Sequence, residues 1–150
     1  MADIKSPEER SLNMSKIKSK NTKPEEYIRK RLYEKGYRYR KNYSSVFGHP
    51  DIWIPKHKVA VFVNGCYWHR HKGCKYAYMP KSRVEFWDKK FRANIARDIE
   101  VKKTLEDQGI RMLIIWECTV KKMTKSSEVE NTIMSSIDTF VTSENSYLEL

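Results

Sequence analysis

The three cysteines of this chain fall into a pattern that is typical of a metal site. Cys66, His71 and Cys74 follow one another with the spacing Cys-x4-His-x2-Cys, and Cys118 is the remaining cysteine among the 150 residues. Thiolate sulfur and imidazole nitrogen suit Zn²⁺, and four such ligands complete a tetrahedral structural site. The sequence therefore predicts that one ion ties residues 66–74 to the segment around Cys118, so the fold must bring these distant segments together.

Two alternatives to this ligand set remain open from the sequence. His69 gives the spacing Cys-x2-His, which is as acceptable for a zinc ligand as that of His71. The cysteines can also be small buried core residues beside an unrelated histidine. We favour the metal site because one ion uses every cysteine of the chain, whereas a disulfide leaves one over and is unexpected in a reducing compartment.

Charge and hydropathy indicate the class of partner. The chain has 30 Lys and Arg residues against 19 Asp and Glu, a net charge of +11, and the basic residues are spread through most of the sequence. A polyanion such as DNA is the expected partner, although a merely soluble basic protein has the same charge. No stretch approaches the ~20 apolar residues of a membrane span, and the first residues have no hydrophobic signal core, so we expect an intracellular protein.

The hydrophobic pattern predicts an α/β domain. We expect helices over residues 23–35, 82–108 and 128–141, and strands over residues 37–40, 51–54, 59–63 and 112–116. Capping boxes open the first two helices, Thr22 with Glu25 and Ser82 with Glu85, with a bend or a later start near Trp87 as an alternative. The order of the elements predicts a three-layer domain, with a mixed central sheet and helices on both faces.

Composition sets the expected boundaries of the domain. Residues 1–21 are polar and basic, and we expect an arm with a short helix around residues 7–17, either semi-independent or disordered until it closes over a partner. Residues 22–141 form the domain proper, with a long metal loop over residues 64–80. Residues 142–150 are expected to be a loose tail.

Several polar residues near the strand ends are candidates for catalysis. Asp51 begins one predicted strand and Val63 ends the next, so a carboxylate and a backbone carbonyl are available as the oxygen ligands that Mg²⁺ prefers. Taken alone, an aspartate after proline is more often a turn cap. His69, which the zinc site does not need, is a candidate general base for the attacking water.

The metal loop also presents residues suited to contact with DNA. Tyr67, Trp68 and Trp87 lie in basic surroundings, where aromatic rings can insert between base pairs, and a mismatch lowers the cost of that insertion. Core packing is the alternative for these rings, most of all for Trp87. Arg70 lies on the same loop and is a further candidate for DNA binding.

The loop resembles the signature of one enzyme family. Residues 65–71, Gly-Cys-Tyr-Trp-His-Arg-His, are similar to the Gly-Cys-[Phe/Tyr]-Trp-His-x-His of the very short patch repair (Vsr) endonucleases. Further matches are Arg10-Ser-x-Asn13-Met14, Pro50-Asp51, Glu85-Phe86-Trp87, Asn94, Arg97-Asp98 and Ile115-Trp116-Glu117-Cys118. The resemblance covers most of residues 8–120 and implies a variant of the restriction-endonuclease core.

The resemblance also implies an activity and a catalytic set. The family nicks one DNA strand 5′ to the thymine of a T:G mismatch that arises from deamination of 5-methylcytosine. By motif, Asp51 and the Val63 carbonyl would bind Mg²⁺, and His69 would be the base. Glu25 and Asp98 would act in the outer shell, Glu25 through metal-bound water, although Glu25 also has a plain role as a helix cap.

The remaining implications concern zinc, DNA and partners. Zn²⁺ would be held by Cys66, His71, Cys74 and Cys118, and the intercalating side chains would be Tyr67, Trp68 and Trp87. The expected partners are duplex DNA with a T:G mismatch, mismatch-repair proteins and a cytosine-5 DNA methyltransferase. We expect a monomer that is cytoplasmic and nucleoid-associated in a bacterial-type cell.

Two departures from the family pattern matter for the mechanism. Asn64 stands where some members have a second active-site histidine, and an amide can orient water or phosphate but cannot take a proton. Two residues, Lys72 and Gly73, separate His71 from Cys74, whereas a histidine-rich version of this loop in the family can have one residue there. Two other functions therefore remain in view: a zinc-stabilised DNA-binding module without catalysis, and a restriction-system nicking endonuclease that does not require a mismatch.

Overall fold

The computed structural model describes residues 21–150, so residues 1–20 of the predicted arm, with its helix at residues 7–17 and the Arg10–Met14 match, lie outside the described residues. The elements follow in the order α2 (Lys23–Glu34), β1 (Arg40–Lys41), β2 (Ile52–Ile54), a short 3-10 helix (Pro55–His57), β3 (Val59–Asn64), α3 (Val84–Asp107), β4 (Arg111–Trp116), α4 (Glu117–Lys125), α5 (Ser127–Thr142) and β5 (Tyr147–Glu149). No helix in this described part is long and apolar enough to cross a membrane.

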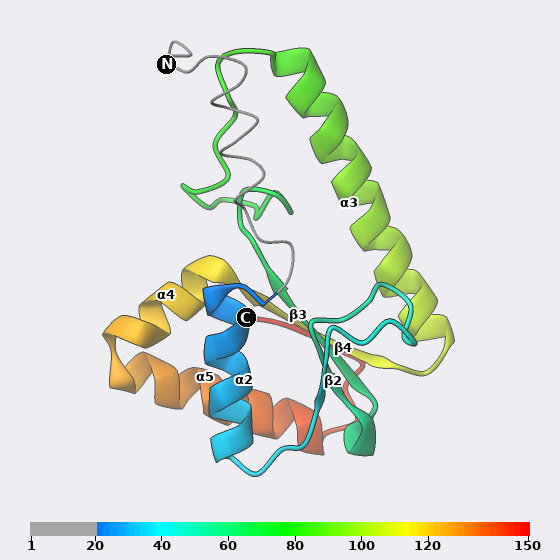
Figure 1. The fold of residues 1–150 in the computed structure, drawn as a ribbon, viewed down its shortest axis with the longest axis vertical. Helices are drawn as coiled ribbons and strands as arrows, with labels where there is room; N and C mark the ends of the chain where they lie inside the picture. The colour runs from blue at the N-terminus through cyan, green and yellow to red at the C-terminus, as the bar shows by residue number, and fades with distance from the viewer. Residues whose placement is uncertain (1–20) are drawn as a thin grey trace.

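A mixed five-stranded sheet forms the centre of the domain, in the order β1-β2-β3-β4-β5 (Figure 1). The pairs β1–β2 and β2–β3 are antiparallel, while β3–β4 and β4–β5 are parallel. Because β3 and β4 are parallel neighbours, their carboxyl ends lie at the same edge, where Asn64 is opposite Trp116. The segments that carry the predicted zinc ligands both leave the sheet at this edge.

Alternation along β3 divides the core between the two faces of the sheet. Val59 and Val61 pack with residues of α2, α4 and α5, whereas Ala60 and Phe62 pack with residues of α3. This is the period of two expected of a strand that is covered on both sides. In Figure 1, α3 stands apart from the other helices and extends past the sheet toward the metal loop. The predicted α/β architecture, with helices on both faces, is confirmed.

The end of the chain differs from the prediction. Residues 142–150 were expected to be a loose tail, but residues 147–149 form β5 and pair in parallel with β4. Leu148 packs against the core cluster on one face of the sheet and Tyr147 against the cluster on the other. The strand therefore covers an edge of β4 that would otherwise expose unpaired backbone groups.

Some boundaries of helices and strands differ from those predicted from the sequence. The capping box predicted for Ser82 and Glu85 does not form, because α3 begins at Val84 after Arg83, which has a left-handed φ of 53° and no side-chain cap. The guanidinium of Arg83 lies 4.4 Å from the Phe86 ring instead. Of the strand predicted over residues 37–40, only Arg40 is in β1, and α4, which contains Cys118, was not predicted.

Candidate functional site

The four predicted zinc ligands come together in the structure. The ligand atoms of Cys66, His71, Cys74 and Cys118 all lie within 4.8 Å of one another. Cys118 Sγ is 3.4 Å from His71 Nδ1, so it is His71 that joins the cysteines rather than His69. Two thiolates and an imidazole from one loop and a third thiolate from α4 form a set that could hold a metal ion.

Backbone turns and one aromatic contact shape this cluster. The N–H of His71 donates to the carbonyl of Cys66 at 3.0 Å, and the N–H of Cys74 donates to the carbonyl of His71 at 3.2 Å. The indole of Trp116 stacks on the His71 imidazole, with ring centroids 4.1 Å apart and an interplanar angle of 6°. Burial raises the pKa of the Cys66 thiol to about 12. Its thiolate therefore needs a cation beside it, which fits a metal site.

All the predicted catalytic residues except Asp98 line one cavity beside the metal loop. This cavity, which we call the catalytic cavity, has a volume of about 620 Å³, and its walls include Glu25, Asp51, Val63, Asn64 and His69. The N–H of Val63 donates to Asp51 Oδ2 at 2.8 Å. The Asp51 carboxylate is thus fixed beside the residue whose carbonyl is the second predicted Mg²⁺ ligand.

The electrostatics of Asp51 fit a site for a divalent cation. Burial, and then the nearby Glu25 carboxylate, raise the pKa of Asp51 to about 7, although the N–H of Val63, the Arg29 guanidinium and His69 act in the opposite direction. A cation between the two carboxylates would remove the cost of holding like charges together in a buried place. The oxygen donors present here therefore suit Mg²⁺.

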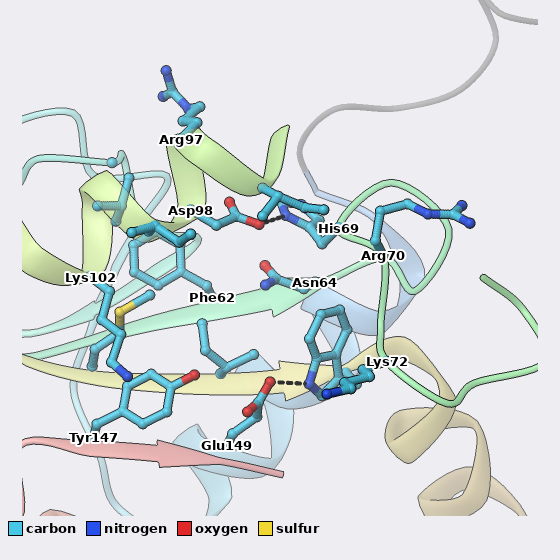
Figure 2. A pocket seen from close by; sticks show the side chains of 17 residues that line it. Phe62, Asn64, His69, Arg70, Lys72, Arg97, Asp98, Lys102, Tyr147 and Glu149 are labelled. Atoms are coloured by element: carbon cyan, nitrogen blue, oxygen red, sulfur yellow. Dashed lines mark hydrogen bonds and ion pairs between the residues drawn. The ribbon is translucent and has the colours of Figure 1, made fainter. Parts of the chain in front are cut away.

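His69 and Asp98 form the hydrogen-bonded pair expected of an oriented base. His69 Nδ1 lies 2.8 Å from Asp98 Oδ2, and Asp98 comes from α3 (Figure 2). A carboxylate at Nδ1 keeps the proton on that nitrogen, so Nε2 is left to accept one. Asn64, at the end of β3, is 8% exposed, and Figure 2 shows it below this pair, in a second cavity of about 370 Å³ between α3 and the sheet.

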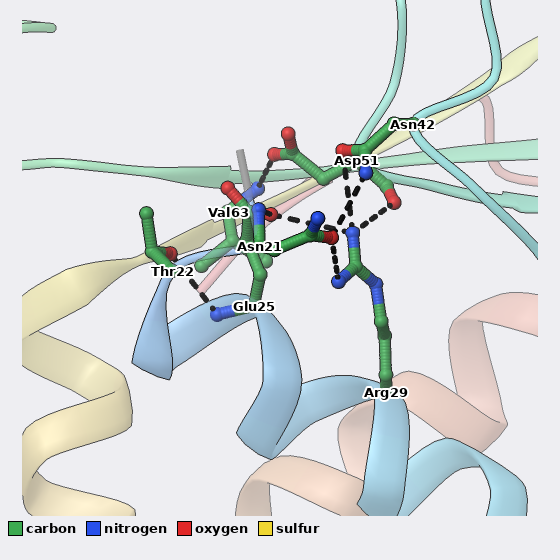
Figure 3. Close-up of polar contacts among 7 residues, drawn as sticks. All are labelled: Asn21, Thr22, Glu25, Arg29, Asn42, Asp51 and Val63. Atoms are coloured by element: carbon green, nitrogen blue, oxygen red, sulfur yellow. Dashed lines mark hydrogen bonds and ion pairs between the residues drawn. The ribbon is translucent and has the colours of Figure 1, made fainter. Parts of the chain in front are cut away.

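Glu25 is held by contacts that the sequence did not reveal. Thr22 Oγ1 accepts from the N–H of Glu25, as the capping box predicts, but the Glu25 carboxylate accepts from the N–H of Asn21 at 2.7 Å. Arg29 and Asn42 complete this group (Figure 3). The available signal was Arg29 itself, a charged residue four positions after Glu25 on the apolar face of its helix.

The three predicted intercalating residues belong to one group of rings. This aromatic cluster consists of Tyr67, Trp68, Tyr78, Phe86, Trp87 and Phe91. Ring centroids are 5.8 Å apart for Trp68 and Trp87 and 6.0 Å apart for Tyr67 and Trp87. Tyr78 is 64% exposed and Phe86 43% exposed, and neither ring was predicted from the sequence to contact DNA.

Arg70 has a structural role within the metal loop. Its two terminal nitrogens donate to the carbonyls of Tyr67, Ala77 and Tyr78. Its guanidinium carbon lies 3.9 Å from the centroid of the Phe91 ring. The side chain therefore holds the two ends of the loop together against α3, and its predicted contact with DNA stays a prediction.

Comparisons with known proteins find similarity to DNA endonucleases. The family model described as DNA mismatch endonuclease Vsr matches residues 2–75. The type II nicking enzyme V.NmeAIP of Neisseria meningitidis serogroup A is 41% identical over 137 residues, which is 91% of this chain and 97% of the relative. V.XorIIP of Xanthomonas oryzae pv. oryzae, also a type II nicking enzyme, is 40% identical, covering 82% of this chain and 90% of its own. DNA mismatch endonuclease Vsr of Escherichia coli strain K12 is 33% identical, with 85% and 81% covered.

Proposed function

This chain belongs to the Vsr family of DNA endonucleases, and we propose that it nicks one strand of duplex DNA 5′ to the thymine of a T:G mismatch, with Mg²⁺ as the catalytic ion. Such mismatches arise when 5-methylcytosine is deaminated, so a cytosine-5 DNA methyltransferase would create the positions at risk. Mismatch-repair proteins would act on the nicked product. The protein would work as a monomer, because one domain carries the whole set of proposed residues.

One observation carries this proposal: Tyr67 and Trp68 line the same cavity as Asp51 and His69. Rings that insert beside a mismatch would then lie next to the groups that cut the backbone. An unpaired or mispaired step is cheaper to unstack than a regular one, which provides a physical basis for the mismatch preference. Because the proposed intercalating rings and the proposed cleaving groups surround one cavity, an enzyme is favoured over a binding module without catalysis.

The proposed chemistry assigns roles to six residues in or beside the catalytic cavity. Asp51 and the Val63 carbonyl would hold Mg²⁺, which when bound stabilises the charge that develops on the scissile phosphate. His69 Nε2 would take a proton from water while Asp98 keeps the imidazole oriented through Nδ1. The water oxygen then bonds to phosphorus and the bond to the 3′ oxygen breaks; the 3′ oxygen takes a proton from solvent water, which leaves a 3′-hydroxyl and a 5′-phosphate. Glu25 and Asn64 would orient water.

The metal cluster would have a structural task. Three thiolates and one imidazole are the ligands of closed zinc sites, so we assign Zn²⁺ to Cys66, His71, Cys74 and Cys118. The ion would hold the loop that carries Tyr67, Trp68 and His69 against the end of β4. Catalysis would therefore depend on zinc indirectly, through the position of the loop.

A nicking assay tests the proposed function. End-labelled duplexes that differ in one base pair, T:G or C:G, are incubated with the protein in Mg²⁺ or in EDTA, and the cut strand is sized on a denaturing gel. We expect one cut, 5′ to the mismatched thymine, in Mg²⁺ only. Cleavage that persists in EDTA, or no cleavage in any flanking sequence of a mismatch panel, contradicts the proposal.

A second candidate function is a nicking enzyme without a mismatch requirement. It is favoured by the names of two relatives, which are described as type II nicking enzymes. The same assay separates the candidates, because this enzyme would cut the C:G duplex at a rate close to that of the T:G duplex. A large preference for T:G would exclude it.

A further inference from the structure

We propose that Arg29 is a positioning residue that holds Glu25 and the backbone of Asp51 in one fixed arrangement, so that the catalytic cavity is ready to receive a divalent cation. The inference rests on the proposed function, in which these two carboxylates serve the same ion. It concerns a residue outside the catalytic set described above, and it follows from the contacts of the guanidinium.

Arg29 occupies a place that is costly for a charged residue. It is 3% exposed and shares the inner side of α2 with Ile28 and Leu32. A buried guanidinium destabilises the fold unless its donors are satisfied. NH1 and NH2 of Arg29 find acceptors in polar groups at or near the catalytic cavity, whereas Nε has no hydrogen-bond partner among residues 21–150.

The guanidinium contacts four residues, Asn21, Glu25, Asn42 and Asp51 (Figure 3). Its NH1 donates to Asn21 Oδ1 at 2.8 Å. Its NH2 lies 3.3 Å from Glu25 Oε2, 3.3 Å from Asn42 Oδ1 and 3.0 Å from the carbonyl oxygen of Asp51. Arg29 thus contacts both Glu25 and Asp51, which lie 26 positions apart in sequence and both line the cavity.

Glu25 is divided between an anchored oxygen and an available one. Oε2 accepts from the N–H of Asn21 and from Arg29. Among the hydrogen bonds of residues 21–150, none uses Oε1. Since Glu25 lines the catalytic cavity, Oε1 is the oxygen left for a metal-bound water, and Arg29 sets the plane of the carboxylate that presents it.

Asp51 is held from the backbone side. Its carbonyl accepts from Arg29 and also from the N–H of Asn42 at 3.0 Å. Its carboxylate accepts from the N–H of Val63, across the antiparallel pair β2–β3. The residue is therefore fixed at both ends, and its side chain is aimed at the end of β3 before any ion arrives.

Two asparagines in left-handed turns complete the arrangement. Asn21 has a φ of 55° and Asn42 a φ of 44°, a region that asparagine tolerates better than most residues. Asn42 Nδ2 donates to Asn21 Oδ1 at 2.9 Å, the same oxygen that Arg29 NH1 contacts. These two side chains contact both terminal nitrogens of the guanidinium fork. A lysine has no such fork and cannot make the same set of contacts.

The experiment compares Arg29→Lys and Arg29→Met with Arg31→Met as a matched control. Arg31 lies on the same helix and forms ion pairs with Glu34 and Glu130, away from the cavity. Mn²⁺, a probe for the Mg²⁺ site, is titrated calorimetrically into each zinc-loaded protein, and thermal unfolding is measured in parallel. Loss of an outer-shell partner typically weakens metal binding about 10- to 100-fold, and we expect that loss for both Arg29 variants but not for Arg31→Met.

A further variant protects the test against a folding defect. Asn42→Gly tolerates the left-handed φ but removes the contacts to Arg29 and Asn21, so it should weaken Mn²⁺ binding in the same direction while it stays folded. Wild-type Mn²⁺ affinity in folded Arg29→Lys and Asn42→Gly would overturn the inference. The wild-type protein reports separately on the proposed function: if it binds Mn²⁺ but does not nick the T:G duplex, that function fails while the test of Arg29 still stands.

Discussion

At the scale of single residues, Asp51 decides whether the proposed chemistry can occur. We expect Asp51→Asn to lower the single-turnover nicking rate by ~10³-fold or more, because a metal that stabilises the scissile phosphate contributes several kcal/mol. Binding to the mismatched duplex, followed by fluorescence anisotropy, should be retained, since the basic surface is unchanged. Asp107→Asn, an exposed residue at the end of α3, is the control for the same substitution. Full nicking by Asp51→Asn would remove Asp51 from the mechanism.

The pair of His69 and Asp98 gives a second prediction at this scale. Asp98→Asn keeps the shape of the side chain but removes the charge that stabilises a protonated imidazole, so the nicking rate should fall about 10²- to 10⁴-fold. Mn²⁺ binding should stay near that of the wild type. Asp107→Asn, at the end of the same helix, controls for the loss of a charge from α3. An unchanged rate in Asp98→Asn would show that His69 works without this partner.

The residues found from the sequence and those missed by it differ in a physical way. Cys66 and His69 were predicted as a ligand and a base from residue types and spacing within one run of sequence, and Asp51 from its place before a strand together with the family resemblance. Arg29 and Asn42 could not be predicted, because their contacts depend on a left-handed turn that brings a distant loop onto α2. Spacing along a helix shows which residues lie on the same face, but it does not show which distant segment packs against that face.

At the scale of secondary structure, the sequence predicted the long elements best. The helices α2 and α5 and the strands β3 and β4 lie close to their expected residues, since each has a clear periodicity or a continuous apolar run. The segments α4 and β5 were missed because they are short, and because β5 is defined by pairing with β4 rather than by its own three residues. The hydrophobic pattern of a short segment cannot predict a strand that is stabilised mainly by pairing with a neighbouring strand.

The strand β5 also supports the metal cluster, which leads to a prediction for Glu149. Trp116 Nε1 donates to Glu149 Oε1 at 2.8 Å, and the same indole stacks on His71. Removing this acceptor in Glu149→Ala should destabilise the fold by about 1 kcal/mol and speed the release of metal to a chromogenic chelator. Glu149→Gln keeps an oxygen acceptor and should retain most of both properties. Glu144→Ala, in the loop before β5, is the control; release rates equal to wild type would contradict the link.

At the scale of the whole molecule, the catalytic cavity and the metal cluster share one edge of the sheet. The metal loop leaves β3 after Asn64, and Cys118 follows β4 directly, so both are carried by the parallel pair at the centre. Asp51 reaches the same edge through its hydrogen bond to Val63. The restriction-endonuclease-like core therefore brings Asp51, the proposed metal ligand, and His69, the proposed base, to one end of the sheet with the rings of the loop, and a bound ion would keep the loop in place.

Removal of the metal tests this dependence directly. We expect about one Zn²⁺ per chain by elemental analysis, and Cys118→Ser should lose it, because a structural site needs its full ligand set and its binding energy contributes to folding. The variant should unfold at a lower temperature and lose nicking, since Trp68 and His69 would no longer be held against α3 through contacts such as that of Asn94 with the Trp68 carbonyl. Thr119→Ala, one position further along α4, should retain the ion and both properties. If Cys118→Ser retained its full metal content and wild-type stability, the loop would not depend on this cluster, and the position of the rings beside the catalytic cavity would need another cause.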